Sequence, residues 1–131
     1  MAVRTRRCDA GERAGRMTKG EQFTEAFEIV DAWVEQEGEL ADACVTLAIH
    51  AGIAFADVIC CARLGKHAIG DDHNEAVALL KTVDPTAANH LATLLAMKTL
   101  AAYSHQGVTR ALLVKAKPAM THLHTTARSI T

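Results

Sequence analysis

Apolar side chains recur at helical spacing in the first half of the chain. Residues 21–36 carry one such stripe, with acidic residues at many of the other positions. The stripe consists of Phe23, Phe27, Val30 and Val34. Residues 39–64 continue the period and are rich in alanine, which predicts a long helix with a face of small residues. Gly38 and Gly65 are expected to end these two helices, because glycine tolerates the left-handed conformation of a helix C-terminus.

Two start signals predict helices in the middle of the chain. Asp72 and Glu75 have the spacing of a capping box, which predicts a short helix over residues 73–82. Asp84-Pro85 combines an N-cap acid with a proline at the first helical position, where the missing N–H does no harm. This second signal predicts a helix over residues 85–103.

The last predicted helix begins after Thr109, which is a suitable N-cap, and extends to about Arg128. Pro118 is expected to bend or break it, because proline removes a helical hydrogen bond. Residues 1–18 have no apolar period, so we interpret them as a mobile basic tail, with one domain over residues 19–131. The predicted fold is all-α: an antiparallel up-and-down four-helix bundle with one extra short helix.

Composition favours helices over strands. Half of the 131 residues are apolar, alanine and leucine dominate, only 4% are aromatic and two are proline. The formal net charge is −1, but residues 1–19 hold six bases against two acids, and the chain after Asp84 holds five bases and no acid. We interpret the charged stretches as solvated helix faces that complement one another. A nucleic-acid patch is the alternative, but it usually raises the pI above about 9, whereas the pI here is about 6.6.

The cysteines and the longest apolar run favour a cytoplasmic protein. Cys8, Cys44, Cys60 and Cys61 have neither metal-site nor disulfide-framework spacing, so we expect reduced thiols. Residues 45–62 are interrupted by His50 and Asp57, which predicts a buried bundle helix and no membrane span.

Asp57 is the most unusual candidate site residue, because it stands in an apolar segment. A buried carboxylate is costly without a partner, so we expect His50, Arg63 or His73 to pair with it. A structural polar network is the favoured interpretation, and a catalytic acid is the alternative. A metal site built from His50, Asp57 and His73 is a third reading, although no zinc motif is present. We predict no cofactor and no bound metal.

Three segments give the chain a resemblance to a known family. They are the alanine-rich run His50 to Gly65, the segment Asp72-His73-Asn74-Glu75-Ala76, and the segment Met97 to His105. Together they resemble the HEPN superfamily of small helical proteins. The resemblance implies a four-helix bundle that dimerises, acting as a ribonuclease in toxin–antitoxin or defence systems or as an inactive binding module.

The resemblance also suggests site residues. Active members carry an arginine, four to six intervening residues and a histidine; here Lys98 stands in the arginine position, Tyr103 where a histidine is common, and His105 where a tyrosine often follows. Lysine lacks the planar fork that clamps a phosphate, so we predict a non-catalytic homodimeric binding module with a partner protein or an RNA or nucleotide ligand. The alternatives are a metal-independent ribonuclease using Lys98, Tyr103 and His105, and a metal-binding bundle. The predicted ligand-binding residues or polar core network are His50, Asp57, Arg63, Asp72 and His73.

Overall fold

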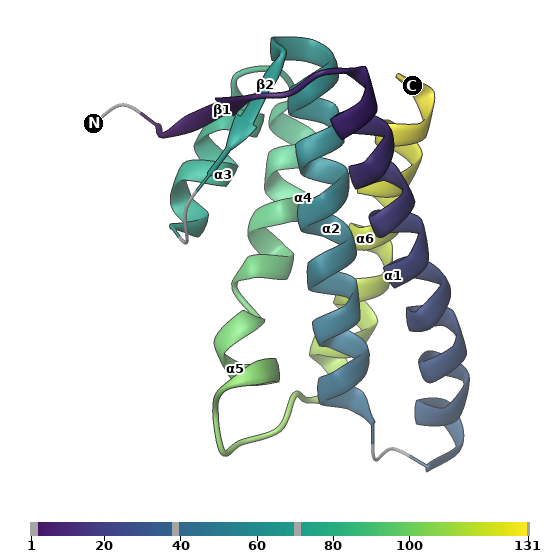
Figure 1. The fold of residues 1–131 in the computed structure, drawn as a ribbon. Coiled ribbons are helices and arrows are strands. Elements are labelled where there is room, and N and C mark those ends of the chain that lie inside the picture. Colours follow the sequence, from purple (N-terminus) through teal and green to yellow (C-terminus); the bar gives the residue numbers. More distant parts are fainter. Residues whose placement is uncertain (1–2, 38–39, 70–71, 131) are drawn as a thin grey trace.

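The structure, a computed structural model, describes residues 3–37, 40–69 and 72–130 and is mostly helical, as predicted for an all-α protein (Figure 1). The helices of this described part are α1 (Ala10–Glu37), α2 (Ala41–Leu64), α3 (His73–Lys81), α4 (Pro85–Leu95), α5 (Lys98–Ala102) and α6 (Arg110–Ser129). Two short strands, β1 (Thr5–Arg7) and β2 (Lys66–Ala68), form an antiparallel sheet that the sequence did not predict.

Helix α1 begins at Ala10, and not near residue 21, so the prediction of a mobile tail over residues 1–18 is wrong for the described residues. Asp9 caps the helix: its Oδ1 accepts a hydrogen bond from the Glu12 backbone N–H at 2.7 Å. The first turns of α1 hold one large apolar side chain, Met17, which packs against the core. Toward α2, Gly20 lies against Phe55 and Arg16 binds Asp57. One methionine, a glycine and a charged group leave no apolar period to detect.

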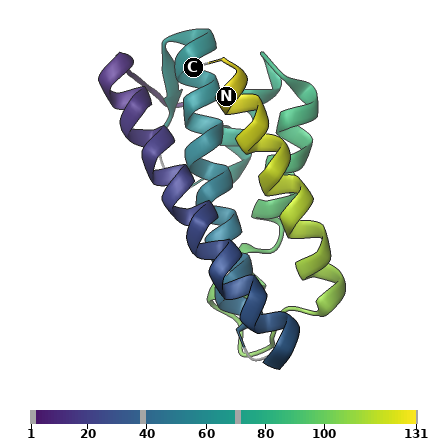
Figure 2. The ribbon, with the colours of Figure 1, turned by 90° about the vertical axis from the view of Figure 1, so that its right-hand side faces the viewer.

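Helix α2 lies in the middle of the molecule, packed between α1 and α6 and also touching α4 and α5 (Figures 1 and 2). Its predicted inner face is confirmed, since Val45, Ile49 and Ile59 are buried, and Gly65 ends it with a φ of 70°. Within the described residues, α2 is the one helix long and apolar enough to cross a membrane by length and composition, but 72% of that window is buried inside the protein. A core helix passes the same test.

The N-caps at Asp72, Asp84 and Thr109 are confirmed, whereas one interruption was missed and the predicted break at Pro118 is absent. Asp84 accepts a hydrogen bond from the Ala87 N–H at 2.9 Å, and Asp72 and Thr109 cap α3 and α6 in the same manner. The helix predicted over residues 85–103 is divided into α4 and α5, with a tight turn in which the Met97 N–H donates to the Leu94 carbonyl. No glycine or proline marks this turn; Met97 is buried there. Pro118 does not break α6, which continues through it.

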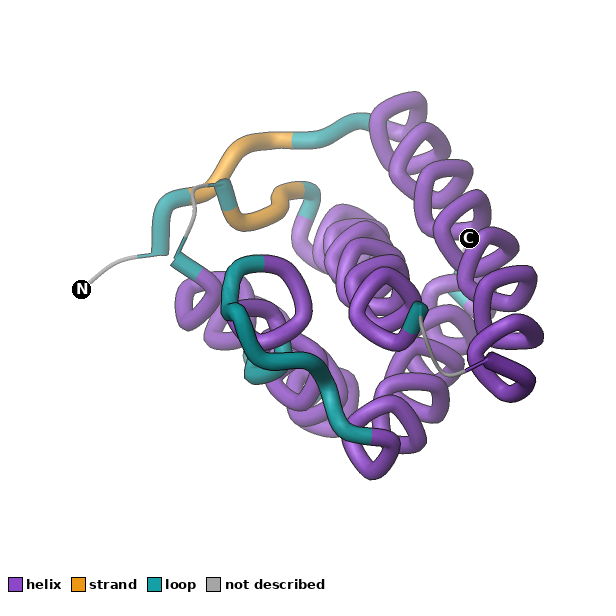
Figure 3. The backbone as a smooth tube through the Cα atoms, turned by 90° about the horizontal axis from the view of Figure 1, so that it is seen from below, coloured by secondary structure: helices purple, strands orange, loops and turns teal. Residues whose placement is uncertain are grey.

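The strands lie beside each other at one edge of the helical body (Figure 3). Thr5 pairs with Ala68, Arg6 with His67 and Arg7 with Lys66. The chain before α1 is thereby attached to the connection between α2 and α3.

Two histidines stack where α4 meets α6, and they make stability depend on pH. The rings of His90 and His122 are 4.2 Å apart. Burial, and then the neighbouring His122, lower the pKa of His90 below its ordinary value of 6.5, against an opposing effect of Asp84. The folded state therefore favours neutral His90, and stability is lost as the pH falls from about 6.5 through the lowered folded pKa.

We therefore expect the thermal midpoint to decrease between pH 7.5 and pH 5.5, and His90→Gln to decrease less over this interval. Thermal denaturation followed by circular dichroism at both pH values measures the difference. An equal decrease in both proteins would exclude His90 as the responsible group.

Candidate functional site

A cavity of about 320 Å³ lies where α2, β2, α3, α4 and the start of α5 meet. Its apolar lining comes from Ile53, Ala56, Ala68, Ala76, Leu91 and Leu95, and its polar lining from His50, Asp57, Asp72, His73 and Lys98. Four of the five residues predicted for a ligand site or polar network line this cavity, together with one predicted catalytic residue. The volume is at the lower end of the range for small-molecule sites.

Lys98 and His73 form the central polar contact of the cavity. The Lys98 Nζ lies 2.9 Å from the His73 Nε2. An ammonium group has donors and no acceptor, so in this contact Lys98 donates and the His73 Nε2 accepts. The turn at Met97 makes Lys98 the first residue of α5, and the Asp72 cap makes His73 the first residue of α3. Two helix starts thus bring together residues that are 25 positions apart.

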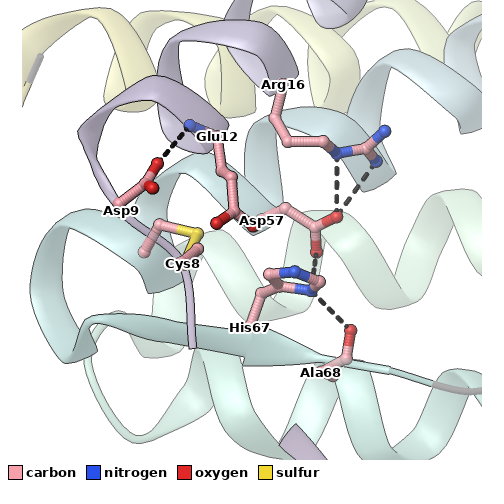
Figure 4. The surroundings of a disulfide bond; sticks show 8 residues. Cys8, Asp9, Glu12, Arg16, Asp57, His67 and Ala68 are labelled. Carbon is pink, nitrogen blue, oxygen red and sulfur yellow. Dashed lines mark hydrogen bonds and ion pairs between the residues drawn. A yellow bond between two sulfur atoms is a disulfide. The ribbon is translucent and has the colours of Figure 1, made fainter. Parts of the chain in front are cut away.

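Asp57 lies in the wall of the cavity and has partners other than those predicted (Figure 4). The Arg16 Nε and Nη2 are each 3.0 Å from Asp57 Oδ2. The His67 Nδ1 is 3.9 Å from Asp57 Oδ1 and 2.9 Å from the Ala68 carbonyl oxygen. The expectation that the carboxylate is paired is confirmed, but His50, Arg63 and His73 are not the partners. Arg16 was missed because it belongs to the segment interpreted as a tail.

Burial shifts the titration of this carboxyl group. Desolvation raises the pKa of Asp57 above 3.8, and the neighbouring Arg16 and His67 oppose the shift. The ion pair with Arg16 neutralises the wall of the cavity on that side.

The segment before α1 holds α3 against β2. The Arg4 backbone N–H and Nη2 donate to the two carboxylate oxygens of Glu75, at 3.1 and 3.0 Å. These bonds lower the pKa of Glu75. The Glu75 carboxylate was predicted to complete a capping box with Asp72, but in the structure it binds Arg4.

A disulfide joins Cys8 to Cys61, so the prediction of four reduced thiols is wrong for this pair. The two residues are 53 positions apart, and their Cα atoms are 5.8 Å apart. The sequence did not indicate this disulfide, because Cys8, the partner of Cys61, lies in the segment before α1. Cys44 and Cys60 are free and buried, and burial raises the pKa of each thiol to about 12. These two thiols are therefore unreactive near neutral pH.

The remaining predicted site residues do not join this cavity. Tyr103 is 74% exposed at the end of α5, His105 is exposed in the following loop, and Arg63 is exposed in the last turn of α2. In the described part of the chain, no hydrogen bond or ion pair connects Lys98 to Tyr103 or His105. His50 does reach the cavity, and its ring stacks on Phe23 of α1 at 5.4 Å.

The acidic and histidine side chains of the described residues do not form a metal site. Across residues 3–37, 40–69 and 72–130, no three His, Cys, Asp or Glu side chains lie close enough to hold a metal ion. His50, Asp57 and His73 line the same cavity without converging on one point.

Comparison with known proteins adds no assignment. No protein-family model matches the chain, and no curated protein has a significantly similar sequence. The residues of the cavity are therefore the basis for inferring a function.

Proposed function

We propose that this protein is a non-catalytic, HEPN-like binding module whose cavity holds a small anionic ligand, with a mononucleotide as the model compound. The observation that carries the proposal is the Lys98 ammonium, hydrogen-bonded at 2.9 Å to His73 inside a cavity whose walls are partly apolar. An ammonium group in such surroundings attracts an anion strongly, because water competes poorly there.

Asp57 does not cancel this attraction, because it is paired with Arg16. Asp72 keeps its charge, but it accepts the Asn74 N–H at the start of α3, where the helix N-terminus stabilises a carboxylate. Lys98 retains donors that His73 does not use. The side chains of Ile53, Leu91 and Leu95 can cover an apolar part of the ligand, such as a base.

In the proposed architecture, α1, α2, α6 and the α4–α5 pair occupy the four positions of an up-and-down bundle, and α3 is the extra short helix. The packing of α2 against α1 and α6, and of α4 against α6, supports this description. We further propose a cytoplasmic homodimer. On α1, Ile29 and Trp33 are four residues apart and 59% and 57% exposed, so they form an apolar face that a second copy could cover. Sedimentation showing a monomer at micromolar concentration would exclude the dimer.

Lys98→Met is expected to weaken the binding of adenosine monophosphate by about 10- to 100-fold, the contribution of one charge-assisted hydrogen bond. Isothermal titration calorimetry with adenosine monophosphate, and with inorganic phosphate as a second probe, measures the change. Lys115→Met, which removes an exposed lysine of α6, is the matched control and should bind as the wild type does. Equal affinity of the Lys98 and Lys115 variants would exclude this site.

A metal-independent ribonuclease is the second candidate function, and the contact between Lys98 and His73 favours it as well. A cation beside an imidazole can bind a phosphate and move a proton, so Lys98 and His73 would act in place of the predicted Lys98–Tyr103–His105 set. Cleavage of single-stranded RNA in a metal chelator tests this candidate. Activity that is lost in His73→Ala and retained in His105→Ala would support it, and no cleavage by the wild type would exclude it.

A further inference from the structure

Residues 3–9 form an arm that is fastened to the body of the protein in three ways. Its strand β1 pairs with β2, Arg4 binds Glu75 of α3, and Cys8 is bonded to Cys61 at the end of α2. Backbone hydrogen bonds from Cys8 to Gly65 and from Ile69 to Arg4 extend the attachment at both ends of the sheet.

The two elements held by the arm also build the cavity. Strand β2 contributes Ala68 to the lining and His67 to the Asp57 network. Helix α3 contributes His73, the partner of Lys98. The arm therefore fixes one side of the cavity without lining it.

The disulfide is accessible from one side only. Cys8 is partly exposed and lines an open hollow of about 500 Å³, together with Arg7, Asp9, Glu12, Leu64 and Gly65. Cys61 is 5% exposed. An attacking thiolate is therefore expected to approach Cys8 more readily than Cys61, which makes Cys61 the leaving group.

We propose that the Cys8–Cys61 disulfide is a redox modification site that controls the ligand cavity, and that a dithiol reductant opens it. A thiolate of the reductant attacks Cys8 Sγ, forms a mixed disulfide and releases Cys61 as a thiolate, which takes up a proton. The second thiol of the reductant then closes the reductant's own disulfide and releases Cys8, which is protonated in turn. Two electrons pass from the dithiol to the protein, leaving two cysteine thiols.

Opening the disulfide weakens the arm because the other fastenings are small. The sheet has three residue pairs, and Arg4, which is 62% exposed, makes an ion pair that water screens. With the covalent link gone, the arm, β2 and the start of α3 form a unit of low local stability that opens without unfolding the core. Since His73 moves with α3, the cavity loses its arrangement of imidazole and ammonium. This regulation rests on the function proposed above.

Hydrogen exchange of the full chain, measured by mass spectrometry, tests the proposal. Treatment with dithiothreitol is expected to speed exchange in residues 66–69 and 73–80 by at least 10-fold, with little change in α6. Cys8→Ser should show the fast exchange without the reductant and no further response to it. Cys60→Ala, which keeps the disulfide, should respond as the wild type does. Unchanged exchange after reduction, or four titratable thiols in the unreduced protein, would overturn the proposal.

Calorimetry with adenosine monophosphate distinguishes the proposed redox control from the proposed ligand site. The reduced protein is expected to bind about 10-fold more weakly than the oxidised protein. Equal binding in both states would overturn redox control and leave the ligand site standing. Faster exchange with no binding in either state would overturn the ligand site and the control of binding, while the redox opening of the arm would stand.

Discussion

Phe55→Ala is expected to lower the free energy of unfolding by about 3–5 kcal/mol, the usual cost of removing a buried phenyl ring. Phe55 is fully buried in α2. Its ring stacks on His124 of α6 at 4.6 Å, and Gly20 of α1 lies against it. This side chain of α2 thus contacts two other helices, α1 and α6, and the cavity left by alanine cannot close without moving them. Chemical denaturation at pH 7 measures the loss.

A surface control and a variant of Gly20 test whether this contact explains the loss. Tyr103→Ala, at an exposed position, should change the free energy of unfolding by no more than about 0.5 kcal/mol. Gly20→Ala should destabilise the protein although alanine favours helices, since its Cβ would lie 2.5 Å from the Phe55 ring. A stabilising Gly20→Ala, or a cost below about 1 kcal/mol for Phe55→Ala, would show that α1 and α6 do not pack on this ring.

Arg16→Met is expected to cost about 2–3 kcal/mol at pH 7, because it leaves the Asp57 carboxylate without its main partner. A fully buried broken pair costs about 3–5 kcal/mol, and the smaller value allows for the 17% exposure of Asp57 and for His67 nearby. Chemical denaturation of the variant and of Arg63→Met, which removes an exposed arginine, gives the difference.

The pH dependence of this cost has a definite sign. Removing Arg16 removes an effect that lowers the pKa of Asp57, so the folded pKa increases further above 3.8. A carboxyl group with a raised folded pKa destabilises the folded state when it is ionised, and this penalty decreases as the pH falls from the folded pKa toward the ordinary value of 3.8. The cost of Arg16→Met should therefore shrink on acidification, and adding Asp57→Asn should restore most of the stability at pH 7. A cost that is the same at pH 7 and pH 4.5 would contradict the assignment.

Several features of the site were recognisable in the sequence, because each depends on local chemistry. Asp57 within an apolar run required a partner, since an unpaired charge is costly wherever it is buried. Asp72 was recognisable as the N-cap of a short helix that begins at His73. Lys98 was identified through the family resemblance. Tyr103 and His105, which were predicted together with it, do not line the cavity, because the chain beyond the turn at Met97 carries them to the surface.

The sequence by itself determined the helical class, the caps at Asp72, Asp84 and Thr109, and the buried face of α2, because propensity, capping and periodicity act between residues a few positions apart. Tertiary structure alone decided that Arg16 pairs with Asp57, that Cys8 bonds Cys61 and that Lys98 meets His73. These partners are 41, 53 and 25 positions apart, and only the packing of separate helices brings them within reach. Pairing between residues far apart in the sequence leaves no periodic pattern. A single unusual residue can therefore be recognised in the sequence, but its partner cannot.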